Sequence, residues 1–479
     1  MGFSLANFVL VGLLCQISTF AYAQGSAAHA PEPPAASIAA PPPSSSPLGV
    51  TEPFSYADFG WLNGNSRQKN SVLDSKYFTG QVMVDTNYIY DFAMPKDHSL
   101  VGSTNAGRTG EFEVEQIGVG GDFHVDRARA RLMTQFGMYS TMTPRNDAST
   151  GRGQWDLGDA YRYISEAYGG YHWDVLNGIN LDAGIFMSYV GLCSYYNNEN
   201  WIYQMSYVSA NTPWFFNGMR LQIFPTDRFK MELWLINGWQ SYGSFNELPG
   251  LGTQVLWRPT ENTSFVTNDY WGTDTATNPG RQRFHSDNSF QYKYLDKPVN
   301  FVSKGAFSVT LDAGCETGGG VQCTGGNSAN TPSQYFLGFM VYNRLWFDKD
   351  KFAFTVGGGA ITNPGRYLVL LPSIQNPNSP GALGGATAAN NNTSFTENPG
   401  DHFNAWDSSV TFDYMPDQST TFRIEFIHRA ADIPYFAGPG GITSPDGQNT
   451  RVNTGASDTW APDLKSTENR IDMAMMLRF

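Results

Sequence analysis

Polar and apolar residues alternate along most of the chain from residue 77 onward. In the segment YFTGQVMVDTNYIYDF, residues 77–92, one face carries Phe78, Val82, Val84, Tyr88, Tyr90 and Phe92, and the other carries Gln81, Asp85, Asn87 and Asp91. Successive side chains of a β-strand point to opposite faces, so this pattern predicts a long strand with one apolar and one polar face. The pattern returns at residues 230–236, 284–294, 406–414 and 422–429, where the polar positions include Lys230, Glu232, Arg423 and Glu425.

The connections between these segments alternate in length. About sixteen strand-like segments can be counted, with short connections near residues 125, 178, 225, 259, 297, 350 and 416. Long polar connections lie between them, at residues 93–110, 140–160, 190–213, 240–251, 272–283, 312–333, 362–405 and 430–468. A soluble sandwich has no reason to alternate turns and loops in this way, whereas a transmembrane barrel does. We therefore predict an all-β fold: a single transmembrane antiparallel up-and-down β-barrel of about 16 strands, with long external loops and short periplasmic turns.

Three arginines share one face of the segment DRARARLMTQFG, residues 126–137. Arg127, Arg129 and Arg131 alternate with Ala128, Ala130 and Leu132. In a soluble sheet this face would meet water. In a transmembrane barrel it must point inward, because an arginine facing lipid at mid-membrane costs roughly 2–4 kcal/mol. The preceding strand carries Glu111, Glu113 and Glu115 at the same spacing, and we expect these acids on the same inward face at a different height.

Two interpretations of these interior charges stay open. Opposed acidic and basic groups create a field that selects ions, because fixed charges act more strongly in a low-dielectric wall than in bulk water. Alternatively, the same groups form salt bridges that stabilise the wall. The arginines favour anions and the overall negative charge favours cations, so the sequence leaves the ionic preference undecided.

The two ends of the chain differ in character from its middle. Residues 1–23 predict a signal peptide, with an apolar core followed by the small-residue site Ala21-Tyr22-Ala23. Residues 24–53 are rich in Ala, Pro and Ser, which predicts a disordered leader, and the barrel is expected over residues 54–479. Within it, residues 54–64 are expected to form a short helix or turn at the barrel base. The C-terminal NRIDMAMMLRF alternates as a closing strand would.

Net charge argues against one class of function, and cysteine spacing predicts a disulfide. A net charge of −13 argues against nucleic-acid binding, which requires a basic surface. Cys315 and Cys323 bracket a Gly-rich segment, and in an exported protein a loop disulfide is the simplest interpretation; metal binding by the pair is the alternative. Cys193 is left as a free buried thiol whose role the sequence does not define.

The order of several motifs resembles a known family. YFTGQVMVDTNYIYDF, RARLMTQFG, EAYGGYHWDVLNGINLDAGIF, NGWQ and NPGRYLVLLP follow one another as in the porin-2 type β-barrel porins of the Gram-negative outer membrane. The similarity spans roughly residues 54–479. It implies a transmembrane barrel and passive transport, and it supplies no catalytic or selectivity-determining residues.

These observations together predict an outer-membrane porin, a passive diffusion channel for ions and small hydrophilic solutes. The alternative is a plugged structural or surface-binding barrel that acts through its external loops. We expect no enzymatic activity, cofactor or metal, since no hydrolase, metalloprotease or phosphate-loop motif occurs; a dispersed Ser/His/acid set stays open. The expected partners are outer-membrane lipid, the solutes and other copies in a homotrimer. Of the loops at 362–405 and 190–213, either could fold inward, but packing over the rim is the preferred expectation.

Overall fold

The computed structural model describes residues 52–144, 147, 154–275, 278–326, 331–364, 402–442 and 463–479. Sixteen of its strands form the barrel wall: β1 (Phe78–Asp91), β2 (Phe112–Val125), β3 (Ala128–Thr134), β4 (Ile164–Trp173), β5 (Ile179–Met187), β6 (Phe215–Thr226), β7 (Phe229–Ile236), β8 (Gly250–Thr260), β9 (Thr263–Gly272), β10 (Gln282–Asp296), β11 (Val302–Thr317), β12 (Tyr335–Phe347), β13 (Phe352–Thr362), β14 (Asn404–Tyr414), β15 (Thr420–Ala431) and β18 (Thr467–Arg478). The predicted signal peptide and nearly all of the predicted leader lie outside the described residues.

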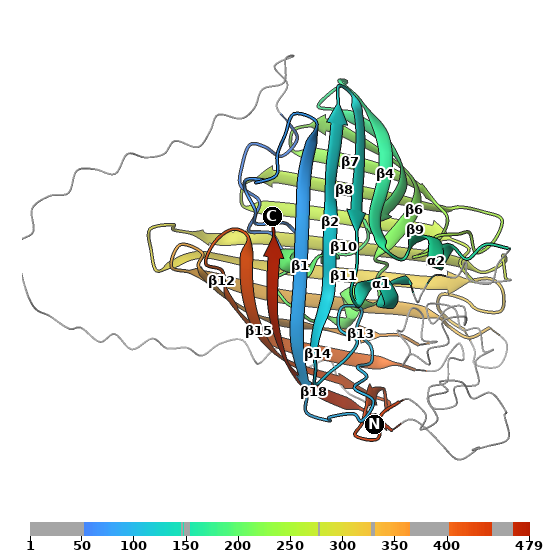
Figure 1. Ribbon diagram of the computed structural model, residues 1–479. Helices are drawn as coiled ribbons and strands as arrows, with labels where there is room; N and C mark the ends of the chain where they lie inside the picture. Colours follow the sequence, from blue (N-terminus) through green and yellow to red (C-terminus); the bar gives the residue numbers. More distant parts are fainter. Residues whose placement is uncertain are drawn as a thin grey trace, which may run out of the picture. The chain divides into compact units, whose positions relative to one another are not determined.

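These strands close into one antiparallel barrel. Each strand pairs with its neighbour in the chain, except that a small ribbon, β16 (Phe436–Ala437) with β17 (Leu464–Lys465), precedes the last strand. Closure is made by β1 and β18, which pair from Met83↔Arg478 to Asp91↔Arg470 and lie side by side in Figure 1. The prediction of an up-and-down barrel with sixteen strands is confirmed. A closed sheet pairs every strand on both sides, which is the condition for crossing a membrane with strands.

The two ends of the barrel are built differently. At the end that holds Phe78 and Arg478, the connections between strands are two to five residues long. The opposite end carries the long connections, including the short helices α1 (Tyr139–Met142), α2 (Leu157–Tyr161), η3 (Asn197–Glu199) and α3 (Tyr207–Ala210). In outer-membrane barrels the short turns face the periplasm and the long loops face outward. Within the described ranges, no helix combines the length and hydrophobicity that a membrane-crossing helix needs.

The two faces of the wall have opposite chemistry. Most outward positions of β12 to β15 are exposed and apolar, including Phe339, Val341, Phe354, Val410, Phe412, Phe422, Ile424 and Phe426. Inward positions of the same strands are buried, and many of them are polar, including Arg344, Thr355, Asp407, Thr411, Asp413, Arg423 and Glu425. This inversion of the usual soluble arrangement is what a lipid-facing exterior requires.

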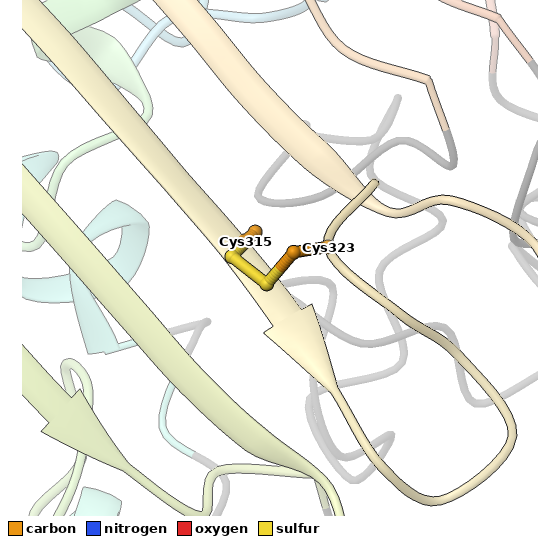
Figure 2. Close-up of a disulfide and its surroundings, with 2 residues drawn as sticks. All are labelled: Cys315 and Cys323. Atoms are coloured by element: carbon orange, nitrogen blue, oxygen red, sulfur yellow. A yellow bond between two sulfur atoms is a disulfide. The ribbon is translucent and has the colours of Figure 1, made fainter. Parts of the chain in front are cut away.

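A disulfide joins Cys315, near the end of β11, to Cys323 in the loop that follows the strand (Figure 2). The two cysteines are eight positions apart in the sequence. Their bond closes a loop at the end of the barrel that carries the long connections.

Candidate functional site: the barrel interior

The loop between β5 and β6 folds into the barrel. We call residues 188–214 the inner loop; nearly all of its side chains are buried, including Tyr195, Tyr196, Trp201, Ile202, Tyr203 and Tyr207. Its hydrogen bonds reach strands all around the wall. Tyr203 Oη donates to Asp85 of β1 at 3.0 Å, Tyr196 Oη donates to Glu166 of β4 at 2.7 Å, and Tyr189 Oη donates to the Asp269 carbonyl of β9 at 2.9 Å. The inner loop therefore occupies the middle of the barrel.

Charged side chains of β14 and β15 hold the inner loop by its backbone. The Glu425 carboxylate accepts from the amides of Tyr203 and Gln204 at 2.7 and 2.8 Å. Arg423 donates to the carbonyls of Asn200 and Ile202 at 2.7 and 2.6 Å, and it pairs with Asp413 at 2.6 Å. Hydrogen bonds to charged groups are stronger than neutral ones, so these two residues are principal anchors of the inner loop.

A second segment covers the end of the barrel with the short turns. We call residues 54–67 the strap. At its start, the Phe54 amide donates to the Asp227 carbonyl in the β6–β7 turn at 2.7 Å. At its end, Arg67 donates to the carbonyls of Asp417 and Thr420 at the β14–β15 turn, at 2.6 and 2.5 Å. Six strands separate these two turns on either side of the barrel, so the strap crosses the full diameter of the opening.

Aromatic rings of the strap lie against two arginines of the wall. The Arg258 guanidinium lies 4.9 Å from the ring centre of Phe54 and 4.5 Å from that of Phe59, and Arg228 lies 4.4 Å from that of Tyr56. Each such cation–π contact contributes about 0.5–2 kcal/mol. The strap consists of turns and bends, so the expected turn at the barrel base is present and the alternative, a short helix, is not.

The strap and the inner loop touch each other. The Trp201 amide donates to the Asn63 side-chain oxygen at 2.9 Å, and Trp201 Nε1 donates to the Trp61 carbonyl at 3.1 Å. Gly64 has φ of 80°, and a Cβ there would lie 2.2 Å from the Leu192 carbonyl oxygen, so this close approach requires glycine. Two layers of chain thus lie between the two ends of the barrel.

The preferred expectation that the long loops pack over the rim is wrong for the inner loop. Its aromatic residues, unusual for a solvated loop, find their partners on inward-facing carboxylates and arginines of the wall. The other loop that could fold inward, residues 362–405, lies almost entirely outside the described residues.

The opposite wall, formed by β3 to β7, retains contact with solvent. Four inward-facing cations lie there, which we call the cationic strip: Arg129, Arg131, Arg220 and Lys230. Each has a carboxylate partner on its own strand or on a strand one or two places away in the barrel. Arg129 and Arg220 both pair with Asp182, at 3.2 and 2.8 Å. Arg131 pairs with Glu166 and Asp122 at 2.9 and 2.7 Å, and Lys230 with Glu232 at 2.7 Å.

In most of these pairs the cation is the more exposed partner. Side-chain exposure is 31% for Arg129 and 14% for Arg220, against 0% for their shared partner Asp182. Lys230 is 15% exposed and Glu232 is 2% exposed. Arg131 and Glu166 are equally exposed, and Asp122 is half exposed. Three of the four cations therefore face the remaining interior space with their carboxylates behind them.

The other charged residues that the sequence predicted to face the interior lie outside the cationic strip. Arg127 precedes β3, in the two-residue turn after β2, and pairs with Asp174 at 2.7 Å with half of its side chain exposed. Glu111 precedes β2 at the long-loop end and pairs with Arg108. Glu113 is partly buried and lies near the same arginine, and Glu115 is fully buried and accepts from Asn87 at 2.9 Å. The acids and the arginines thus lie at opposite ends of the β2–β3 hairpin, because Asp122 pairs in register with Arg131.

Cys193 lies in the inner loop, and burial raises the pKa of its thiol to about 12. Only the thiolate is nucleophilic, so at pH 8 the folded protein should react very slowly with a charged thiol reagent, whereas unfolded protein should react fully. Mass spectrometry of the modified chain measures both. Rapid labelling of the folded barrel would contradict the burial of the inner loop.

Neither the strap's anchors nor Arg220 could be identified from sequence patterns. Arg220 stands alone in a strand of mixed pattern, and its role depends on Asp182 of a neighbouring strand and on the rings of Phe186 and Trp234, 4.8 and 5.4 Å away. No group of three or more His, Cys, Asp or Glu residues within the described ranges is placed to hold a metal ion.

A closed barrel with an apolar outer band, a polar interior and an infolded loop defines an outer-membrane β-barrel of the porin type. Residues 77–457 match the family described as "Putative beta-barrel porin-2, OmpL-like". The chain belongs to this family and is a Gram-negative outer-membrane protein. The expected resemblance to the porin-2 type is confirmed.

Several solved structures are similar to the chain. The trimer form of OmpT from Vibrio cholerae has 10% identity and a TM-score of 0.46, with 85% of this chain and 100% of that chain covered. DcaP, an outer-membrane channel of Acinetobacter baumannii, has 11% identity and a TM-score of 0.43, with 87% and 100% covered. An anion-selective porin from Comamonas acidovorans has 9% identity and a TM-score of 0.44, with 84% and 99% covered. No curated protein sequence matches the chain.

Proposed function

We propose that the protein is a passive channel for ions and small hydrophilic solutes, and that they pass along the wall formed by β3 to β7. The observation that carries this proposal is the asymmetry of the interior. Inward side chains of β12 to β18 are almost completely buried beneath the inner loop, whereas Arg129, Arg131 and Lys230 keep contact with solvent. The role is one of transport and not of catalysis, and outer-membrane lipid surrounds the apolar outer band.

We further propose that this path favours anions. Charges of the cationic strip are balanced by carboxylates, so selectivity depends on which partner a passing ion approaches more closely. The exposed guanidinium of Arg129 stands in front of the buried Asp182, and Lys230 stands in front of Glu232. Because Coulomb energy falls with distance and the wall has a low dielectric constant, an ion in the path meets a positive potential.

Reversal potential across a planar bilayer under a salt gradient tests this proposal. The wild-type channel should show stepwise openings with a reversal potential of the sign that anion preference gives. An Arg129→Ala, Arg131→Ala double variant should lose most of that preference, because it removes two cations and leaves Asp182, Glu166 and Asp122 facing the path.

Arg127→Ala is the matched control, since it removes an arginine from the turn beyond the cationic strip and should leave the reversal potential nearly unchanged. An unchanged anion preference in the double variant would rule out a role of Arg129 and Arg131 in ion selectivity. The ion pairs would then serve the stability of the wall, and the double variant would show only a lower unfolding temperature.

The second candidate is a closed barrel that acts as a structural or surface-binding protein through its long external loops. The strap and the inner loop favour it, because both cross the interior and contact each other. A correctly inserted barrel that stays silent in the bilayer at all voltages would support this candidate. Homotrimer formation remains a prediction in either case.

A further inference from the structure

One buried carboxylate is shared by two arginines of the cationic strip. Asp182 of β5 pairs through Oδ1 with Arg129 of β3 at 3.2 Å, and through Oδ2 with Arg220 of β6 at 2.8 Å. The Asp182 side chain has no exposed surface, whereas both arginines keep contact with solvent. Two cations against one carboxylate leave one net positive charge at this depth of the wall.

The other ion pairs of the cationic strip carry no such excess. Arg131 pairs with two carboxylates, Glu166 and Asp122, and half of the Asp122 side chain is exposed. Lys230 pairs with Glu232 alone. Among the ion pairs of the strip, the shared carboxylate is thus the one place where cations outnumber carboxylates. An anion in the path therefore meets most of the strip's excess positive charge there.

The strand register places the two arginines and the shared carboxylate in one row. Arg129 lies opposite Gly170 of β4, and Gly170 lies opposite Asp182. Asp182 in turn lies opposite Arg220. Neighbouring strands are about 4.8 Å apart, so Arg129 and Asp182 are separated by about 10 Å of sheet. Their side chains meet because the β4 position between them carries no side chain.

Gly170 is required at this position by the close approach of Asp182. A Cβ on residue 170 would lie 2.1 Å from Asp182 Oδ1, the oxygen that Arg129 approaches. It would also lie 2.4 Å from the Leu181 carbonyl oxygen. Any larger residue at 170 would therefore push the Asp182 carboxylate away from Arg129 while leaving Oδ2, on the side of Arg220, free of this contact.

The next row along the same strands shows the contrast. There Tyr168 occupies the β4 position opposite Arg131, and Gly184 of β5 lies opposite Tyr168. The carboxylates that pair with Arg131 come from β2 and β4, its direct neighbours, and not from β5. Pairing across two strands thus occurs where β4 carries glycine and not where it carries tyrosine.

We propose that Asp182 and Gly170 set the strength of the channel's anion preference. Asp182 is a positioning residue: it is buried, it restrains Arg129 and Arg220 against the wall, and it cancels half of their charge. Gly170 provides the space that this sharing requires. The inference rests on the proposed anion path and assigns opposite signs to its parts. Loss of the Asp182 charge raises the anion preference, whereas loss of Arg129 lowers it.

Reversal potential of the refolded full chain under a KCl gradient tests the proposal. We expect Asp182→Asn to raise the chloride-to-potassium permeability ratio roughly two- to fivefold, because one more uncompensated charge lies beside the path. The asparagine oxygen can still accept from Arg220, as the carboxylate does at 2.8 Å, so the row keeps its shape. Gly170→Ala should shift the ratio in the same direction, because its methyl group displaces Asp182 from Arg129.

Two matched controls separate this effect from a general change in the wall. Glu316→Gln neutralises another buried carboxylate that pairs with two arginines, Arg283 at 2.8 Å and Arg281 at 3.9 Å, away from the path. Gly169→Ala adds the same methyl group to β4 at a position where no atom lies within 4 Å. Both should keep the wild-type ratio. Heat-modifiable migration on gels verifies folding, and Asp182→Asn decides alone if Gly170→Ala does not fold.

Phenylglyoxal labelling followed by mass spectrometry measures the pairing itself and requires no conductance. Arg129 should react faster in Asp182→Asn and in Gly170→Ala than in the wild type or in Gly169→Ala, because its ion pair is lost. An unchanged permeability ratio in Asp182→Asn, beside an anion-selective wild type, would overturn this inference and leave the proposed path intact. A silent or unselective wild type would instead overturn the proposed path, and the labelling would still decide whether Asp182 restrains Arg129.

Discussion

Removing residues 54–67 from the full chain is expected to raise single-channel conductance several-fold. The strap spans the opening from the β6–β7 turn to the β14–β15 turn and carries the rings of Phe54, Tyr56, Phe59 and Trp61 across it. Its removal takes away one of the two layers that obstruct the interior. The measurement is conductance of the refolded protein in a planar bilayer at fixed salt.

The control for this experiment is a deletion of equal length, residues 30–43, in the Ala/Pro/Ser-rich leader upstream of the strap. It shortens the chain without touching the strap, so conductance should equal that of the wild type. Equal conductance in the strap deletion and in the wild type would show that the inner loop alone limits flow. The strap would then serve only to stabilise the turns that it joins.

Arg423→Met is expected to release the inner loop and to lower the free energy of unfolding by about 3 kcal/mol, the scale seen when one partner of a buried ion pair is removed. Arg423 is buried and pairs with Asp413 at 2.6 Å. It also donates to the carbonyls of Asn200 and Ile202, which methionine cannot do. We expect noisier openings of higher conductance, together with faster labelling of Cys193 by thiol reagents.

The same strand offers a matched control for this variant. Arg429 of β15 is also buried, pairs with Glu468 at 2.7 Å, and donates to the carbonyls of Val101 and Gly102 at 2.6 Å. Arg429→Met should therefore cost similar stability while leaving the inner loop in place. If both variants label Cys193 equally fast, general loosening of the barrel explains the result, and Arg423 has no special role as an anchor.

The wall of the barrel could be predicted from the sequence because its rule is local. Alternation at residues 77–92 and 422–429 reports which side of a strand meets lipid, and the alternation of short and long connections reports which end is which. The inward direction of Arg129, Arg131, Lys230, Glu232, Arg423 and Glu425 follows from the same period of two. These inferences need no knowledge of which strands lie opposite one another.

The positions of the inner loop and the strap inside the barrel could not be predicted, because they depend on contacts between residues that are far apart in the sequence. Glu425 holds the amide of Tyr203, more than two hundred residues away, and Arg67 holds Thr420 across a still larger interval. The aromatic residues of the inner loop indicated that the loop is buried, but they did not indicate which part of the barrel it packs against. Arg129 is more exposed than its partner Asp182, and this arrangement depends on how β3, β4 and β5 lie side by side. The alternation of polar and apolar residues does not predict it.

The strap also has a consequence for the order of assembly. It precedes every strand in the chain, yet its two anchors belong to turns at residues 227 and 417–420, which come to opposite sides of one ring only when β18 has joined β1. Bringing such distant residues together costs loop-closure entropy that no contact offsets until the ring exists. The strap is thus synthesised before any strand of the wall, yet we expect it to reach its final position only after the wall has closed.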